Sequence, residues 1–124
     1  GTSGAEWLKR ETAASTAPAK VLVTHRPVWA GSGEGSNLPT LLADSLWRIN
    51  LILAGHNHVY WDYWADVQQI GVPDSRRPVR QIIEVSGPKK YRCNSTATGC
   101  VERSSGFLRV EVYSDRIAIQ RRAV

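Results

Sequence analysis

Two short apolar runs limit what this chain can fold into. They are Val21–Thr24 and Leu51–Ala54, and both read as strands buried on both faces. Between them, large apolar residues return at helical spacing, at positions 38, 41, 42, 46 and 49. The order strand, helix, strand predicts a βαβ unit, which has two parallel strands joined by a right-handed crossover.

All three histidines of the chain follow these two runs. His25 comes after the first run, and His56 and His58 come after the second, behind Gly55. Ligands of open α/β sheets bind beyond the carboxyl ends of the strands, and neighbouring strands lie ~4.8 Å apart. We therefore expect the histidines to share a site. We expect Gly55 to supply a positive φ or a close backbone approach there.

The histidine pattern predicts metal binding. A neutral imidazole is a good ligand for zinc, iron and other first-row metals. His56 and His58 would face one side in an extended stretch, whereas a tight turn would direct them to two neighbouring metals. Asn57 would contact a substrate oxygen or stabilise the turn. A single histidine at a strand end is more often an ordinary residue, so the prediction rests on the coincidence of all three positions.

The remaining sequence predicts an α/β half followed by a β-rich half. We expect Ser3 to cap a helix, with Glu6 as its capping-box partner. The chain contains no internal repeat. The other expected elements are a helix over 5–14, an aromatic strand over 59–64, a loop over 69–78, a strand over 81–85, and a hairpin of 107–113 with 116–120.

The two cysteines predict a short disulfide-closed loop. Cys93 and Cys100 enclose six small, mostly polar residues. A disulfide would indicate an oxidising compartment and a secreted or otherwise extracytoplasmic protein. The alternative is two free thiols in a cytosolic protein. Asn94 also begins a glycosylation acceptor tripeptide, which matters only if the source glycosylates.

Size and charge exclude several classes of protein. The 124 residues amount to one domain or part of one, over 1–124, and the 42% hydrophobic fraction excludes a disordered chain. No run approaches the ~18 apolar residues that a membrane span requires. The net charge of +5 is scattered in small basic pairs without interleaved aromatics, which argues against nucleic acid as a partner.

Two motifs carry a resemblance to a known family. The stretches Lys20–Trp29 and Leu51–Tyr60, with histidine before Arg26 in the first and Gly-His-x-His in the second, resemble the C-terminal half of a calcineurin-like metallophosphoesterase. The branch that the chain most resembles is the purple-acid-phosphatase-like one. The lead-in helix with Trp7 and the strand that begins at Gly106 fit the same pattern.

The resemblance implies a fold and an activity. The fold would be the C-terminal half of a four-layer α/β/β/α sandwich, with one βαβ unit followed by mainly antiparallel strands. In the family pattern, His25 and His56 would ligate one metal and His58 the other, so all three would be catalytic. The implied cofactors are two ions of iron, zinc or manganese, and the implied substrate is a phosphate ester attacked by metal-activated water.

The chain departs from the family in lacking its N-terminal carboxylate motifs. We therefore expect this chain to supply only histidine ligands, and to need a missing N-terminal half or a complementary chain. Alone, it should be inactive. The alternative is a non-catalytic metal-binding or interaction domain that retains the fold.

Three further residues are candidates for contact with substrate. Arg26 offers a bidentate partner for phosphate, although a surface arginine is the plainer interpretation. Asn57 and Tyr60 lie beside the histidines. Tyr60 and the aromatics that follow it would line a cleft or pack as an aromatic strand.

Overall fold

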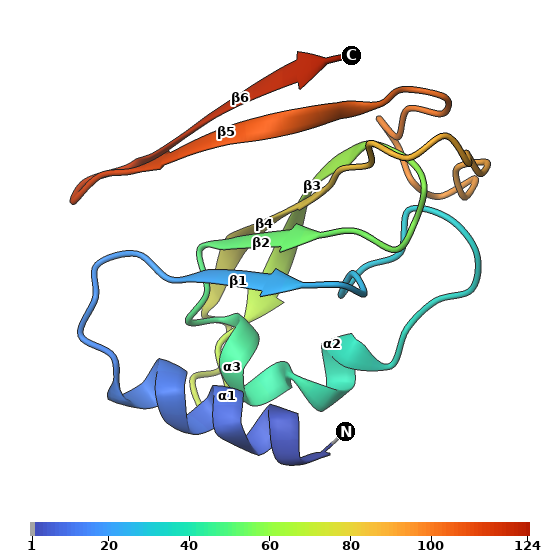
Figure 1. The fold of residues 1–124 in the computed structure, drawn as a ribbon. Coiled ribbons are helices and arrows are strands. Elements are labelled where there is room, and N and C mark those ends of the chain that lie inside the picture. The colour runs from blue at the N-terminus through green and yellow to red at the C-terminus, as the bar shows by residue number, and fades with distance from the viewer. Residues whose placement is uncertain (1) are drawn as a thin grey trace.

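The computed structural model describes residues 2–124 as a mixed α/β structure with a mixed sheet and short helices (Figure 1). The elements in chain order are α1 (Thr2–Ala14), β1 (Val21–Thr24), α2 (Leu38–Leu41), α3 (Ala43–Leu46), β2 (Leu51–Ala54), β3 (Trp61–Gln68), β4 (Arg76–Ile83), β5 (Gly106–Val112) and β6 (Ile117–Ala123).

The four-stranded sheet has the order β1-β2-β4-β3. Strand β1 runs parallel to β2, in register from Val21 opposite Leu51 to Thr24 opposite Ala54. This pairing, with α2 and α3 between the strands, confirms the predicted βαβ unit. Strand β4 is also parallel to β2, whereas β3 is antiparallel to β4. The ends of β1 and β2 therefore lie side by side, and that placement positions the histidines.

The sheet lies between helices and a hairpin. Figure 1 shows the three helices below the sheet and the β5–β6 hairpin above it. A core cluster joins the helices to the sheet, and its buried members are Leu8, Val28, Leu46, Ile49, Ile52, Ala65, Val67 and Val79. The hairpin that the alternating sequence predicted is present, and on one of its faces Val110 is paired with Ile119 and Val112 with Ile117.

The helical crossover differs from its prediction. One helix over 38–49 was expected, but two four-residue helices are found, with Leu42 between them outside helical geometry (φ −100°, ψ 12°). Backbone hydrogen bonds still run from Leu42 N–H to Leu38 O and from Leu46 N–H to Leu42 O. These bonds keep one helical turn between the leucines, so the apolar spacing is correct although the helix is broken.

Helix α1 begins earlier than predicted. It includes Thr2, so Ser3 lies inside the helix and the predicted Ser3 cap is wrong. Leu8 and Thr12 are buried against the rest of the molecule, and the Thr12 hydroxyl donates to the Leu8 carbonyl at 2.8 Å. No helix within residues 2–124 has the length and apolarity needed to cross a membrane.

The apolar run of β1 predicted a strand buried on both faces, and this prediction is wrong. Val21 and Val23 are 36% and 75% exposed, whereas Leu51 and Ile52 of β2 are buried. Val21 and Val23 point to the same face of the sheet, which is left uncovered at β1, the last strand of the sheet among residues 2–124, whereas Leu22 on the opposite face packs against the core. An apolar run alone does not distinguish an inner strand from an edge strand.

The next two strands are displaced from their predicted positions. Strand β3 begins after Tyr60, which forms an isolated bridge with Val101. Strand β4 begins at residue 76, so the loop before it spans 69–75. Cross-strand ion pairs explain the polar start of β4, because Arg80 forms two hydrogen bonds to Asp62 and Arg76 bonds Asp66.

Candidate metal site

Two of the three histidines meet where the parallel strands end. Nδ1 of His56 lies 3.1 Å from Nε2 of His25, and the two rings meet edge to face with centroids 5.0 Å apart. The Gly55 N–H donates to the His25 carbonyl at 3.0 Å, which extends the contact between the strands by one residue. One nitrogen must donate and the other accept, so the pair shares a single proton.

The spacing of this pair suits one metal ion. Zinc–nitrogen bonds are about 2.0–2.1 Å long, which puts two nitrogens on one ion about 2.9 Å apart at a right angle and about 3.3 Å apart at the tetrahedral angle. The observed 3.1 Å between Nε2 of His25 and Nδ1 of His56 falls within that interval. The distance between the two nitrogens is therefore compatible with one ion bound to both rings.

The turn that carries the histidines is built on an unusual backbone angle. The positive φ expected at Gly55 is found instead at His56, whose φ is 63°. A side chain in the left-handed region is uncommon, and such outliers concentrate at functional sites. The Asn57 N–H donates to the Gly55 carbonyl at 2.7 Å and closes the turn. Because of this turn, the His56 ring points toward His25, whereas the His58 ring points toward Lys89.

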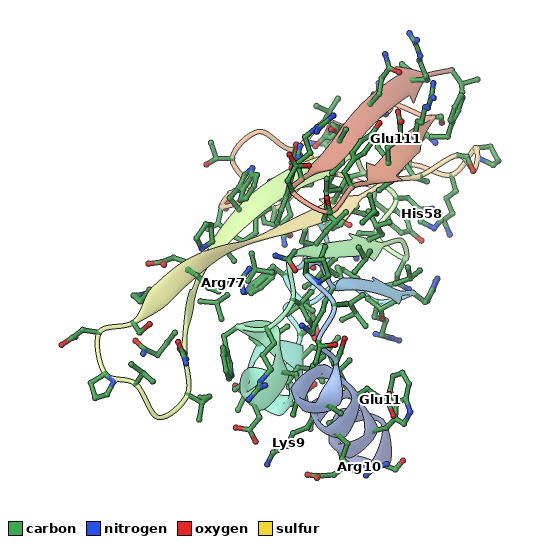
Figure 2. The ribbon with its side chains drawn as sticks, turned by 90° about the vertical axis from the view of Figure 1, so that its left-hand side faces the viewer. Lys9, Arg10, Glu11, His58, Arg77 and Glu111 are labelled. Carbon is green, nitrogen blue, oxygen red and sulfur yellow. A yellow bond between two sulfur atoms is a disulfide. The ribbon has the colours of Figure 1, made fainter. Side chains whose placement is uncertain are left out.

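His58 is held by a different part of the chain. Figure 2 shows it beyond the arrowhead of β2, far from Lys9, Arg10 and Glu11 of α1. Its Nδ1 lies 2.7 Å from the Lys89 carbonyl, and its ring stacks on Tyr91 with centroids 4.9 Å apart. A carbonyl only accepts, so Nδ1 carries the proton and Nε2 keeps its lone pair. Metal-ligating histidines are usually oriented in this way.

His56 and His58 line one cleft of about 840 Å³. Arg26, the glycine-rich segment 32–38 and Tyr91 also line it. Within residues 2–124, no three histidine, cysteine, aspartate or glutamate side chains gather closely enough to hold a metal ion. The structure therefore brings His25 and His56 together and leaves His58 as a separate donor near the same cleft.

Electrostatics favours the neutral form of His56. Burial lowers the pKa of His56 below 6.5, and the positive charges of Arg26, His25 and His58 lower it further. A neutral imidazole has the lone pair that a metal requires. Arg26 thus acts on His56 through its charge and also lines the cleft.

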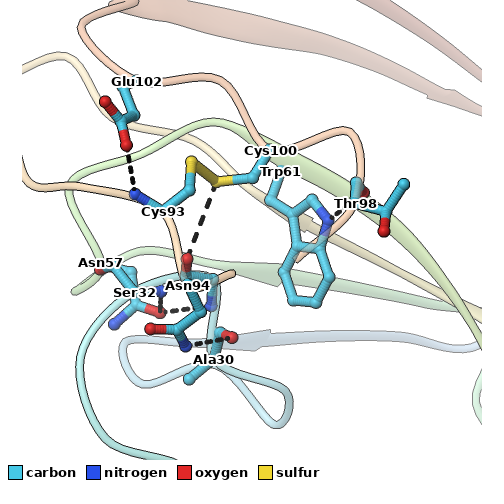
Figure 3. Close-up of a disulfide and its surroundings, with 10 residues drawn as sticks. Ala30, Ser32, Asn57, Trp61, Cys93, Asn94, Thr98, Cys100 and Glu102 are labelled. Atoms are coloured by element: carbon cyan, nitrogen blue, oxygen red, sulfur yellow. Dashed lines mark hydrogen bonds between the residues drawn. A yellow bond between two sulfur atoms is a disulfide. The ribbon is translucent and has the colours of Figure 1, made fainter. Parts of the chain in front are cut away.

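Asn57 connects the histidine turn to the chain after β1. It is 8% exposed, and its Oδ1 accepts hydrogen bonds from Gly31 N–H at 2.8 Å and Ser32 N–H at 3.2 Å (Figure 3). Of the two roles predicted for Asn57, these contacts favour stabilising the turn over touching a substrate.

Tyr60 lies away from the cleft lining. The Arg121 guanidinium sits 4.0 Å above its ring, and burial raises the pKa of its hydroxyl, with Asp62 adding to that increase. Arg121 is in turn bonded to Glu84 at 2.7 Å. These contacts connect the hairpin to the end of β4, so they favour a packing role for Tyr60.

Gln81 is a supporting residue that the sequence analysis did not single out. It is fully buried in β4, and its Oε1 accepts from the Val28 N–H at 2.7 Å and the Trp29 N–H at 3.1 Å. Its Nε2 donates to the Trp29 carbonyl at 2.7 Å. It therefore fixes the chain just after His25. The signal was a polar residue next to Ile82 and Ile83 in the predicted strand, because a buried polar side chain needs a polar partner.

The predicted disulfide is confirmed. Cys93 and Cys100 are bonded, so the alternative of two free thiols is wrong. Bonds of this kind are typical of extracytoplasmic proteins. The Asn94 side chain donates to the Ala30 carbonyl at 3.3 Å, so the nitrogen of the glycosylation tripeptide is engaged inside the molecule.

Neither models of known protein families nor the curated proteins yield a match to this chain.

Proposed function

We propose that this chain is the histidine-bearing part of a metal-dependent phosphoesterase of the calcineurin-like, acid-phosphatase-like type. The observation that carries the proposal is the 3.1 Å approach of His25 and His56 at the ends of two parallel strands. Nε2 of His25 and Nδ1 of His56 would hold one ion, and Nε2 of His58 would hold the other.

The residues present fit such a centre in part. Imidazole nitrogens suit iron, zinc or manganese better than magnesium. When bound, two such ions would neutralise phosphate charge and lower the pKa of an attacking water. The chain's own contribution would be to fix three nitrogen donors and to place the Arg26 guanidinium beside the cleft for a phosphate oxygen. Three neutral ligands do not balance the charge of two cations, so carboxylates must come from elsewhere.

The exposed edge of the sheet supports the requirement that another part of the protein supplies the carboxylates. Within the described residues 2–124, no strand pairs with the outer edge of β1, and its Val21 and Val23 side chains are exposed. An uncovered apolar edge strand is a place where further strands add. In the proposed four-layer sandwich, the carboxylate-bearing half would continue the architecture from this side.

Zinc titration of three single variants tests the proposal. We expect His25→Ala and His56→Ala each to lose the tighter zinc ion, whereas His58→Ala should retain it, as measured by calorimetry and equilibrium dialysis. Equal loss in all three variants, or no zinc binding by the unaltered chain, would sink the assignment. In the complete enzyme, His56→Ala should lower metal content and turnover together. Rapid phosphatase turnover by the 124-residue chain alone would contradict the need for outside carboxylates.

A second candidate is a non-catalytic metal-binding or interaction domain that retains the fold. It is favoured by the absence of a cluster of three ligands among residues 2–124. The two candidates differ in one measurement. A chain that binds zinc through His25 and His56 but gains no hydrolytic activity when joined to a carboxylate-bearing half would be the second kind of protein.

A further inference from the structure

One carboxylate of this chain lies in the same cleft as the histidines. Among the described residues 2–124 that line this cleft, Glu34 is the only acidic one, and it shares the lining with His56 and His58. Its side chain is exposed, and no residue in the described part of the chain forms an ion pair with it. The Glu34 carboxylate is therefore accessible to a cation that enters the cleft.

The segment that carries Glu34 is attached at its base to the histidine turn. This segment, residues 31–36, is called the Glu34 loop below. The N–H groups of Gly31 and Ser32 both donate to Oδ1 of Asn57, at 2.8 and 3.2 Å (Figure 3). The Glu34 loop therefore starts beside the residue that separates the two histidines of the turn.

The tip of the Glu34 loop is not packed against the rest of the molecule. A Cβ added at Gly31, at the base, would lie 3.1 Å from Val59, whereas a Cβ at Gly33 or Gly35 would meet nothing within 4 Å. Figure 1 shows this part of the chain arching out beyond the ends of β1 and β2 before it turns back to α2. Glycine also has the widest choice of backbone angles. The glycines on either side of Glu34 therefore allow its carboxylate to move without displacing a neighbour.

The length of the Glu34 loop permits its carboxylate to approach the histidine pair. Glu34 is two residues beyond Ser32, whose N–H contacts Asn57, and two residues of extended chain span at most about 7 Å. His56 directly precedes Asn57, and both His56 and His25 are exposed to solvent. Among residues 2–124, no three such side chains are gathered around one point, so the tip of the loop has to move inward for a carboxylate to join the two imidazoles.

Two imidazoles and one carboxylate form a common ligand set for a single metal ion. Some zinc enzymes use two histidines and one glutamate, with a further position left for water, and a class of iron(II) sites uses the same donors. The His25–His56 pair already presents two nitrogens 3.1 Å apart. Arg26 also lines the cleft, and its positive charge opposes the binding of a cation by neutral ligands alone. A carboxylate ligand would offset that repulsion.

We propose that Glu34 joins His25 and His56 as the third protein ligand of one metal ion, and that the Glu34 loop closes over the histidine pair when the ion binds. The role of the histidine pair rests on the function proposed above, whereas the carboxylate ligand goes beyond it. The ion is zinc or iron(II), and water takes the remaining coordination positions. His58 does not belong to this three-ligand site.

Calorimetric zinc titration of the 124-residue chain tests the third ligand, at roughly pH 7.5, where an ordinary imidazole is neutral. Glu34→Gln keeps the shape of the side chain but removes its charge. It should weaken binding of the tighter zinc ion at least about 10-fold, since even the outer partners of metal ligands are worth about 10- to 100-fold. Glu6→Gln removes the same charge from an exposed position of α1 and should leave the affinity unchanged. No effect of Glu34→Gln, or equal effects of the two changes, would overturn the proposal.

Carbon NMR of the glutamate carboxylates separates a metal ligand from a nearby charge. In a chain labelled with carbon-13 at glutamate, zinc should shift the Glu34 carboxylate signal, which Glu34→Gln identifies by its absence, and a chelator should reverse the shift. The Glu6 signal should stay in place. If zinc binds and His25→Ala abolishes that binding, but the Glu34 signal does not move, the carboxylate ligand is wrong and the proposed function stands. If the unaltered chain binds no zinc, both are wrong.

Discussion

His56 Nδ1 lies 3.1 Å from His25 Nε2 although 31 residues separate them in the sequence. The parallel pairing of β1 with β2 produces this contact, and a single proton occupies it. A metal ion would compete with that proton for the same lone pairs, so metal affinity at the pair should depend on pH. The predictions below test the pair and the residues that support it.

The first prediction concerns the titration of His56. Burial, and then the charge of Arg26, lower its pKa, so the ring should titrate below 6.5 in an NMR titration. Arg26→Ala should raise the pKa toward 6.5 without reaching it, because burial is the larger cause. Arg122→Ala, at an exposed position of the hairpin, should have no effect. A His56 pKa at or above 6.5 in the unaltered chain would contradict the prediction.

The same pKa predicts how stability varies with pH. The unfolded imidazole binds a proton near 6.5, and the folded ring binds it less tightly. This contribution to stability is therefore present above pH 6.5 and is lost as the pH falls through the lowered folded value. His56→Gln should weaken that part of the pH dependence, as measured by urea unfolding at a series of pH values.

The second prediction concerns Gln81. Gln81→Leu should lower the free energy of unfolding by about 3 kcal/mol, because unsatisfied buried backbone groups cost about 1–3 kcal/mol each and three lose their partner. The exposed Gln120→Leu is the control and should stay within about 0.5 kcal/mol. Equal effects of the two changes in urea unfolding would show that Gln81 does not fix the chain after His25.

The third prediction separates the oxygen of Asn57 from its amide. Asn57→Ala removes the acceptor for Gly31 and Ser32, and should cost about 1–3 kcal/mol of stability. Asn57→Asp keeps an oxygen at that place and should retain most of the stability. Amide exchange of Gly31 and Ser32 should accelerate in the alanine variant only. If amide exchange of Gly31 and Ser32 accelerated in neither variant, Asn57 would not stabilise the chain after β1.

The fourth prediction concerns the link between the hairpin and the sheet. Arg121 makes two hydrogen bonds to Glu84, and these two side chains are 19% and 13% exposed. Arg121→Lys loses the bidentate geometry and the contact with Tyr60, and should lower the free energy of unfolding by about 1–2 kcal/mol. Arg109→Lys alters the exposed ion pair with Glu111, and it should change the free energy of unfolding by less than about 0.5 kcal/mol. If Arg121→Lys and Arg109→Lys lowered the free energy of unfolding equally, burial of the Arg121–Glu84 pair would not contribute to stability.

The sequence predicted the parts of this fold that depend on local pattern. The βαβ unit, the hairpin and the disulfide all follow from spacing along a short stretch, and each is present in the structure. Helix ends and strand ends were less accurate, because they depend on partners distant in sequence. Strand β3 begins after Tyr60, for example, because Tyr60 itself pairs with Val101.

By itself, then, the sequence determined that three histidines follow two parallel strands, since apolar runs and the crossover between them are local features. Only the tertiary structure decided which histidines meet. The left-handed backbone of His56 turns its ring to His25, and residues 89–91 draw His58 away to a different partner. The physical reason is that the direction of a side chain at a turn depends on a single φ angle and on hydrogen bonds to distant segments. Neither of these produces a periodic pattern in the sequence.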